Sequence, residues 1–198
     1  MKAVIILNGE LKSPEFLKKI CDDADLIICA DGGYDKAKTA GVVPHMLLGD
    51  MDSVKNRDFS GETYTFPCEK DETDCELAIS YALEKGAKEI VLACALGGRY
   101  DHALCNLSML LDKPYACILE PDCRVFALKN CEITNEKGKT FSVIPFSDTV
   151  ASISGVKYPV TKGVFRAGTS LGVSNVITED VARIMLHNDG KALIFINE

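Results

Sequence analysis

The stretch "GDMDSV", residues 49–54, places two carboxylates, Asp50 and Asp52, directly after a short apolar run. Two negative charges so close in the chain repel each other, and a bound cation offsets that repulsion. Oxygen ligands without a histidine or cysteine cluster favour Mg²⁺, which commonly bridges one or two carboxylates to the phosphates of a substrate. The pair therefore predicts a magnesium ion and, with it, phosphate chemistry.

More polar residues follow other apolar runs, in "CADGGYD" (29–35), "CEKDETDCE" (68–76) and "LGGRYDHALCN" (96–106). In an open α/β sheet, ligands bind beyond the carboxyl ends of the strands, so these loops are expected to converge on one rim. Taken singly, each acidic residue has a structural explanation, such as a helix start or a turn. Together the loops carry Asp31, Asp50, Asp52, Asp71, Asp74, Glu76, Arg99, Asp101, His102 and Asn106.

Two glycine pairs, Gly32-Gly33 and Gly97-Gly98, would let the backbone approach a phosphate chain closely. Arg99 would add a charge-assisted contact to phosphate oxygens. The sequence contains neither G-x-x-x-x-G-K-[ST] nor G-x-G-x-x-G, so a P-loop and a dinucleotide-binding fingerprint are both excluded. The residues thus indicate nucleotide chemistry of another kind.

Residues 2–120 alternate short apolar runs with amphipathic stretches, which predicts a parallel sheet with helices on its faces. Thr73 and Glu76 form a capping box, and Gly86 can end the helix that it begins. We expect strands at 3–7, 25–30, 45–49, 63–67, 89–96 and 115–120, and helices at 13–24, 33–41, 73–87 and 101–112.

Beyond residues 121–122 the pattern changes to strand-length runs separated by Gly, Asn, Asp and Lys turns, with no convincing helix. The turns "NEKGK" and "HNDGK" indicate hairpins, so this half is expected to be a small antiparallel β domain. Its topology does not follow from the pattern. We expect strands at 124–129, 131–135, 139–146, 150–156, 182–188 and 191–198.

The overall composition excludes several classes of protein. The formal net charge of −7 argues against a nucleic-acid or anionic-membrane surface, since both need clustered Lys and Arg. Most of the nine cysteines lie inside apolar runs and none forms a C-x-x-C pair, which is typical of reduced core residues in a cytoplasmic protein. A cysteine-ligated zinc site is the alternative. The N-terminal apolar run is too short for a membrane span, and neither a signal peptide nor an anchor is expected.

The motifs "ADGG", "GDMDS", "KDETDCE" and "LGGRYDHALCN", in this order, resemble those of the thiamine pyrophosphokinase family, also called thiamin diphosphokinase. The resemblance continues into "RAGTSLGVSN" (166–175) and so covers nearly the whole chain. It implies an enzyme that transfers the terminal diphosphate of ATP to the hydroxyethyl group of thiamine, with Mg²⁺ as cofactor, giving thiamine diphosphate and AMP. It also implies a homodimer with thiamine bound near the subunit interface.

The fold that the resemblance implies is α/β, with an N-terminal parallel-sheet α/β domain and a C-terminal antiparallel β-sandwich domain. The first, residues 1–123, would bind the nucleotide and carry catalysis, and the second, residues 124–198, would bind thiamine. This division agrees with the change of pattern after residues 121–122.

The resemblance also assigns roles to residues. Asp50, Asp52 and Asp74 would be the metal-binding and catalytic carboxylates, with Asp71 as a second candidate; base and metal ligand cannot be told apart from sequence. Ser174 and Asn175 would hold the thiamine pyrimidine, and Val176 stands where some members carry an aromatic or acidic residue. Nucleotide binding would fall to Asp31, Gly32, Gly33, Arg99, Asp101, His102 and Asn106.

Two alternatives remain open at this point. A pyrophosphokinase acting on another alcohol, such as a hydroxymethylpterin, would share the acidic rim but not the "GTS…SN" segment. A nucleotide- or thiamine-sensing module without catalysis would be expected to lack one or more rim carboxylates, all of which are present here.

Overall fold

The computed structural model describes residues 1–56, 58–65 and 71–198. The chain forms two compact units, the first made of residues 1–106 and 115–121 and the second of residues 107–114 and 122–198. The predicted strand at 63–67 extends past the described residues, since 66–70 lie outside them.

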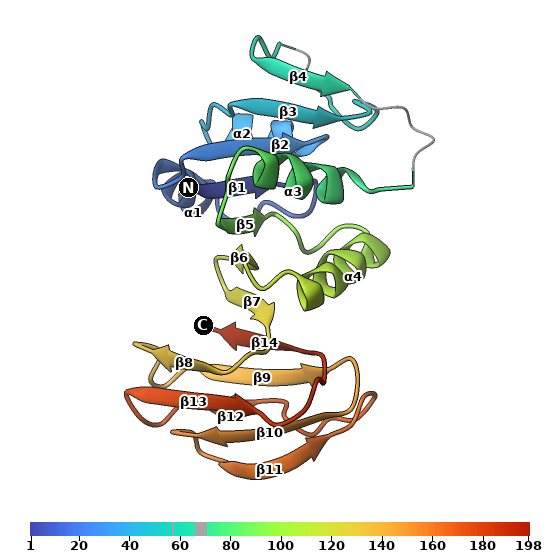
Figure 1. Ribbon diagram of the computed structural model, residues 1–198. Coiled ribbons are helices and arrows are strands. Elements are labelled where there is room, and N and C mark those ends of the chain that lie inside the picture. Colours follow the sequence, from blue (N-terminus) through green and yellow to red (C-terminus); the bar gives the residue numbers. More distant parts are fainter. Residues whose placement is uncertain (57, 66–70) are drawn as a thin grey trace. The chain divides into compact units, whose positions relative to one another are not determined.

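The first unit is built on a parallel sheet with strand order β6-β5-β1-β2-β3-β4, in which each neighbouring pair is parallel. Figure 1 shows these strands with α3 in front of the sheet and α2 behind it. The strands are β1 (Lys2–Ile6), β2 (Leu26–Ala30), β3 (Met46–Gly49), β4 (Glu62–Thr65), β5 (Glu89–Ala93) and β6 (Ala116–Glu120).

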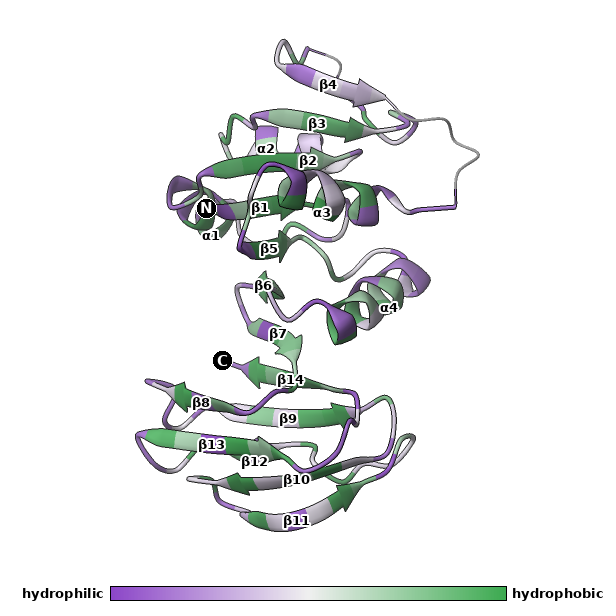
Figure 2. Cartoon of the chain, viewed as in Figure 1, coloured by the Kyte–Doolittle hydropathy of each residue, from purple (hydrophilic) through white to green (hydrophobic). Residues whose placement is uncertain are grey.

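The inner strands of this sheet are apolar along their length because helices cover both faces. Val4 and Ile6 belong to one core cluster, which α1 and α2 complete, whereas the alternate residue Ile5 is equally buried on the other face. Helix α3 packs against β1, β2 and β3. Figure 2 shows the inner strands as hydrophobic, whereas the edge strand β4 carries hydrophilic residues and is exposed along its length.

Local signals set the helix ends. Helix α1 (Pro14–Asp22) begins with Ser13 as N-cap and Pro14 in its first turn, a favoured combination. Helix α2 is Gly33–Thr39, and α3 is Asp74–Glu84. Helix α4 (Tyr100–Met109) continues into a 3₁₀ turn, η1 (Leu110–Asp112). The four predicted helices are therefore confirmed, with ends that differ by a few residues.

The capping box predicted for α3 is confirmed. Thr73 Oγ1 accepts a hydrogen bond from the Glu76 amide at 3.2 Å, and Glu76 Oε2 accepts one from the Thr73 amide at 3.1 Å. At the other end Gly86 has a φ of +90°, a conformation that favours glycine, and its amide donates to the Leu83 carbonyl. None of the helices among the described residues is long and apolar enough to cross a membrane.

The second unit contains two antiparallel sheets, with orders β12-β9-β14-β7 and β11-β10-β13-β8. One cluster of buried side chains joins them; it includes Phe141 of one sheet and Phe165 of the other. The strands are β7 (Cys123–Ala127), β8 (Cys131–Thr134), β9 (Thr140–Pro145), β10 (Thr149–Ser154), β11 (Val160–Phe165), β12 (Asn175–Val176), β13 (Val181–Leu186) and β14 (Ala192–Asn197). A parallel α/β unit and a β-sandwich unit confirm the predicted fold class.

Two of these strands, β11 and β12, were not predicted from the sequence. In β11 the alternation is broken by Gly163 and by Lys162, whose φ is +48°, and the pairing of β10 with β11 shifts register between Ala151 and Ile153. Such a bulge interrupts the two-residue period on which strand prediction depends. Strand β12 has only two residues, too few for a pattern.

Replacement of Thr73 by alanine should lower the free energy of unfolding by about 1 kcal/mol, because it removes the side-chain cap of α3. Urea denaturation measures the change. The exposed Ser80, in the same helix, provides the control, and Ser80→Ala should change stability by less than about 0.5 kcal/mol. Equal stabilities of Thr73→Ala and the wild type would show that the cap contributes nothing.

Candidate active site

Polar loops of the first unit surround a pocket of about 940 Å³. The loops follow the carboxyl ends of β1, β2, β3 and β5 or begin the helices α3 and α4, so residues far apart in the chain meet on one rim, as expected for a parallel sheet. The predicted residues that line the pocket are Asp31, Asp50, Asp52, Asp74, Gly97, Gly98, Arg99, Asp101, His102 and Asn106.

Three of these carboxylates form a tight group at the pocket. Asp31, Asp50 and Asp74 each offer an oxygen, and these oxygens all lie within 4.8 Å of one another. Asp31 follows β2, Asp50 follows β3 and Asp74 is the first residue of α3. Asp31, which was predicted for nucleotide binding, lies close to the predicted metal ligands Asp50 and Asp74, and its nucleotide-binding role stays a prediction.

Asp31 is the most constrained member of the group. It is 8% exposed and has a φ of +47°, an uncommon conformation for a non-glycine residue. Its amide donates to the Leu48 carbonyl at 2.8 Å, and its Oδ2 accepts a hydrogen bond from the Ser53 hydroxyl. The other oxygen, Oδ1, is buried and has no hydrogen-bond partner within the described part of the chain. A buried carboxylate oxygen without a partner is costly unless a ligand completes it.

Gly49 lets Asp31 and Asp50 approach each other. A Cβ at Gly49 would lie 3.0 Å from Asp31 Cβ and 3.2 Å from its Cα, and the φ of Gly49 is +147°. A larger residue would push the end of β3 away from Asp31. Glycine is therefore the residue type that this junction needs.

Asp52 lies beside the group but outside it. Its amide donates to Asp50 Oδ1 at 3.0 Å, which turns the loop back on itself. The negative charge of Asp50 raises the pKa of Asp52 above its ordinary value, and Asp31 and Asp74 act in the same direction. The charges at this rim therefore repel each other, as expected from the sequence. The role of Asp52 as a metal ligand stays a prediction.

The start of α3 positions Asp74, because the capping box fixes the backbone on either side of it. Asp71 precedes this helix in an exposed bend and is not among the described residues that line the pocket. Gly32 and Gly33 are also outside that lining. A Cβ at Gly33 would lie only 2.0 Å from the Ile6 carbonyl oxygen, so this glycine lets α2 start against the end of β1.

Arg99 and Asp101 form an ion pair at the start of α4. Arg99 Nη2 lies 2.6 Å from Asp101 Oδ2, and Arg99 Nε donates to Asp101 Oδ1 at 3.1 Å. Asp101 Oδ1 also accepts from the His102 amide at 3.0 Å. The hydrogen bonds from Arg99, with that from the His102 amide, lower the pKa of the Asp101 carboxyl to about 2. Asp101 therefore keeps the guanidinium in one orientation at the pocket wall.

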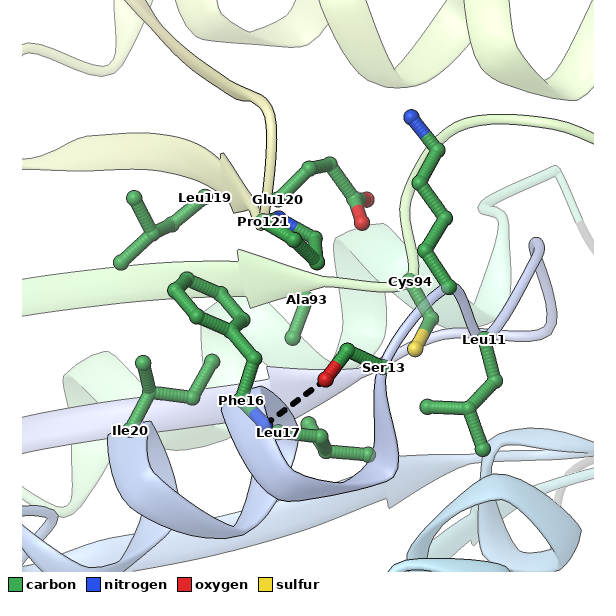
Figure 3. Close-up of a pocket in the computed structure, with 11 residues that line it drawn as sticks. Leu11, Ser13, Phe16, Leu17, Ile20, Ala93, Cys94, Leu119, Glu120 and Pro121 are labelled. Atoms are coloured by element: carbon green, nitrogen blue, oxygen red, sulfur yellow. Dashed lines mark hydrogen bonds between the residues drawn. The ribbon is translucent and has the colours of Figure 1, made fainter. Parts of the chain in front are cut away.

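Two residues anchor the loop that carries Gly97 and Gly98. Asn106 Nδ2 donates to the Ala95 carbonyl at 2.8 Å, and the buried Glu120 accepts from the Ala95 amide at 2.9 Å. Figure 3 shows Glu120 at the end of β6, next to Cys94 of the neighbouring strand end, beside a small second pocket against α1. Glu120 was not predicted from the sequence, although a carboxylate that ends an apolar run was a signal for it.

Ser53 and Asn8 were also missed. Both line the pocket, and Asn8 Nδ2 donates to Ser53 Oγ at 3.0 Å. The signals were available, because Asn8 ends the apolar run of β1 and Ser53 closes the motif "GDMDS". Their partners lie 21 or more residues away along the chain, so the sequence could not assign their contacts.

In the second unit, Asn175 is the first residue of β12 and Ser174 directly precedes it. Ser174 is exposed with a φ of +59°, and its amide donates to Ser142 Oγ at 3.0 Å. Asn175 is buried; its side chain donates to the Tyr158 carbonyl at 2.9 Å and accepts from the Tyr158 amide at 3.0 Å. Asn175 therefore holds the 158 loop in place, and its predicted contact with thiamine stays a prediction.

The grouped carboxylates fit a magnesium ion. They are hard oxygen donors, they converge from three elements, and Asp31 Oδ1 is buried without a partner among the described residues. The histidine of the pocket, His102, lies on α4 and is not a member of the group. The donor set therefore favours Mg²⁺ over zinc.

Two family models match the chain. The thiamin pyrophosphokinase catalytic domain matches residues 17–119, and the thiamin pyrophosphokinase vitamin B1 binding domain matches residues 130–190. The chain belongs to the thiamin pyrophosphokinase family. The resemblance stated from the motifs is thereby confirmed, and with it the enzyme class, an ATP-dependent thiamine diphosphokinase.

Individual members of the thiamin pyrophosphokinase family agree with these matches. Thiamine pyrophosphokinase of Bacillus subtilis is 29% identical over 192 residues, which cover 88% of this chain and 89% of that protein. Thiamine pyrophosphokinase 1 of rice (Oryza sativa subsp. japonica) is 27% identical over 224 residues, covering 94% of this chain and 84% of that protein. The similarity extends over most of both relatives.

Solved structures show the same fold. The crystal structure of thiamin pyrophosphokinase from Geobacillus thermodenitrificans has a TM-score of 0.84 and 25% identity, with 100% of this chain and 98% of that chain covered. That of the Bacillus subtilis thiamine pyrophosphokinase also has a TM-score of 0.84, at 24% identity, with 100% and 99% covered.

Replacement of Arg99 by glutamine should raise the pKa of Asp101 from about 2 towards its ordinary value of about 3.9, because the charged donor is lost. The pKa is lowered in the folded state, so the contribution of the pair to stability is present above the ordinary pKa and is lost as the pH falls through about 2. Carboxyl ¹³C NMR titration measures the change. Lys88→Gln, at an exposed site, is the control, and an unchanged Asp101 titration in Arg99→Gln would contradict the assignment.

Proposed function

We propose that this chain transfers the terminal diphosphate of ATP to the hydroxyethyl group of thiamine in a Mg²⁺-dependent reaction, giving thiamine diphosphate and AMP. The observation that carries the proposal is the group of Asp31, Asp50 and Asp74, whose oxygens lie within 4.8 Å of one another at a pocket of about 940 Å³. A chain of the thiamin pyrophosphokinase family that contains such a group has the means to hold a metal beside the phosphates of ATP.

The proposed metal-holding residues are Asp31, Asp50 and Asp74, and the next carboxylate beside them is that of Asp52. When bound, Mg²⁺ supplies positive charge that neutralises the phosphate oxygens during the transfer. The protein's own contribution is to hold these side chains in place before substrate arrives. The ends of β2 and β3 and the capped start of α3 do so.

The proposed nucleotide contacts lie around the same pocket. Arg99 would pair with phosphate oxygens, and Asp101 keeps its guanidinium oriented. Asn106 anchors the turn of Gly97 and Gly98, through which the backbone can approach the phosphates. The remaining proposed nucleotide-site residues are Gly32, Gly33 and His102.

Diphosphate transfer needs the thiamine hydroxyl in line with the β-phosphorus and a group that accepts its proton. Asp74 or Asp71 is the proposed base. Asp74 has the position for it, since it lines the pocket, whereas Asp71 would need the bend before α3 to bring it closer. Thiamine carries a permanent positive charge on its thiazolium ring, which the acidic rim attracts.

The proposed thiamine contacts are Ser174 and Asn175 in the second unit. The proposed thiamine-binding domain comprises residues 124–198, and the proposed nucleotide-binding domain comprises residues 1–123.

A homodimer with thiamine near the subunit interface is also proposed. Leu171 and Val173, beside Ser174, are about half exposed, as expected of apolar residues that another subunit covers. A cytoplasmic location is also proposed, because most of the nine cysteines lie inside apolar runs, which is typical of reduced core residues.

A product assay tests the reaction directly. Purified protein is incubated with ATP, thiamine and Mg²⁺, and chromatography measures thiamine diphosphate and AMP. Equal amounts of both products, formed only with Mg²⁺, would support the proposal. AMP without thiamine diphosphate would mean that the diphosphate passes to water and not to thiamine, and other alcohols would then be tested as acceptors. Neither product would leave a binding module.

In the same assay, Asp74→Asn should lower turnover about 100-fold or more, because it removes a charged group at the reacting phosphates. Circular dichroism should show an intact fold. Glu84→Gln, at the exposed far end of α3, is the matched control and should retain activity. Near-normal turnover in Asp74→Asn would remove Asp74 from the catalytic set. A loss in Asp71→Asn with metal binding retained would identify Asp71 as the base.

Mg²⁺ and a nucleotide added together should stabilise the folded protein by about 2.7 kcal/mol at 100 times the dissociation constant, because they bind only the folded state. Urea denaturation with Mg²⁺ and α,β-methylene-ATP measures the gain. Asp50→Ala should lose most of this gain while keeping its fold. An undiminished gain in Asp50→Ala would show that Asp50 does not hold the metal.

A further inference from the structure

Ser53 makes three hydrogen bonds with one side-chain oxygen. Its hydroxyl donates to Asp31 Oδ2, and its oxygen accepts from the Gly32 amide at 3.2 Å and from Asn8 Nδ2 at 3.0 Å. We infer that Ser53 is a positioning residue, which holds the Asp31 carboxylate by Oδ2 and leaves Oδ1 to a cation shared with Asp50 and Asp74. The inference rests on the proposed function, because it concerns the proposed metal site.

The direction of these bonds follows from the chemistry of the groups. An amide N–H and an asparagine NH₂ are donors only, so Gly32 and Asn8 occupy both lone pairs of the serine oxygen. The serine hydrogen is then left for Asp31 Oδ2, which as a carboxylate oxygen can only accept. Asn8 and Gly32 thus orient the hydroxyl towards Asp31.

This bond controls the rotation of the Asp31 carboxylate. The last side-chain torsion of aspartate is broad, so a fixed backbone does not fix the plane of the carboxylate. The backbone of Asp31 is already held by its bond to Leu48 and by the start of α2. With Oδ2 bound by Ser53, the buried Oδ1 is the oxygen without a hydrogen-bond partner among the described residues, and it is available to a cation.

Ser53 is itself held in place by its loop. Val54 is buried in the core, and the next two amides, of Lys55 and Asn56, donate to the Asp35 carboxylate at 2.9 and 3.0 Å. These bonds tie the loop after β3 to α2, on which Asp35 lies. The serine therefore supports Asp31 from a rigid position, as residues that orient metal ligands commonly do.

The test measures Mn²⁺ binding, since Mn²⁺ replaces Mg²⁺ at oxygen sites and free Mn²⁺ is counted by electron paramagnetic resonance. Ser53→Ala should weaken Mn²⁺ binding about 10- to 100-fold, the range for loss of a partner that orients a ligand. Ser53→Thr keeps the hydroxyl and should restore most of the affinity. Ser60→Ala, at an exposed site of the same loop, is the control and should bind as the wild type does.

Kinetics provide a second measurement. The Mg²⁺ concentration for half-maximal rate should rise in Ser53→Ala while the melting temperature stays close to that of the wild type, a split that general loss of structure would not produce. If Ser53→Ala fails to fold, Asn8→Ala decides the question. It frees one lone pair of the serine oxygen, so the hydroxyl is no longer directed to Asp31, and Mn²⁺ binding should weaken about threefold.

The outcomes separate this inference from the proposed function. Asp31→Asn is included as a reference that lacks the carboxylate. If Asp31→Asn loses Mn²⁺ binding but Ser53→Ala and Asn8→Ala keep it, the role of Ser53 is wrong and the metal site stands. If the wild type does not bind Mn²⁺, or Asp31→Asn binds as the wild type does, the metal assignment fails and the inference fails with it.

Discussion

The repulsion among Asp31, Asp50 and Asp74 is the interaction on which the rest of the first unit depends. Their oxygens lie within 4.8 Å of one another, and one of the side chains is buried. Like charges at this distance oppose folding, so the surrounding structure must hold them together until a cation compensates them. In a site of this kind the metal ligands are already assembled when the metal arrives. Folding has then overcome the repulsion between the carboxylates before the metal binds.

The parallel sheet is what holds them. Its inner strands are buried on both faces. The close packing of the core therefore fixes the positions of the ends of β2 and β3. Gly49 allows the two strand ends to come into contact, and the capping box of Thr73 fixes the start of α3. Each of the three carboxylates therefore belongs to a residue that lies in a helix or directly follows a strand. None of them lies in the middle of a long loop.

Polar side chains then hold in place the groups that the sheet brings to its rim. Ser53 and Asn8 orient the Asp31 side chain, while Glu120 and Asn106 hold the glycine turn after β5. All four contacts join segments that are distant in the chain or lie across the sheet edge. The contacts to Asp31 and Glu120 involve a carboxylate, and a hydrogen bond to a charged group is stronger than one between neutral groups.

The sequence by itself determined the two kinds of unit, the strands with continuous apolar runs, the capped helix α3 and the acidic rim, because each of these depends on residue type and short spacing. Only the tertiary structure decided that Asp31 lies in one group with Asp50 and Asp74, and which residues support them. It also decided that β11 exists despite its broken period, since pairing with β10 tolerates the bulge. The physical reason is the same in each case. These features depend on contacts between residues that are close in space but distant in the chain, and spacing along the chain does not specify such contacts.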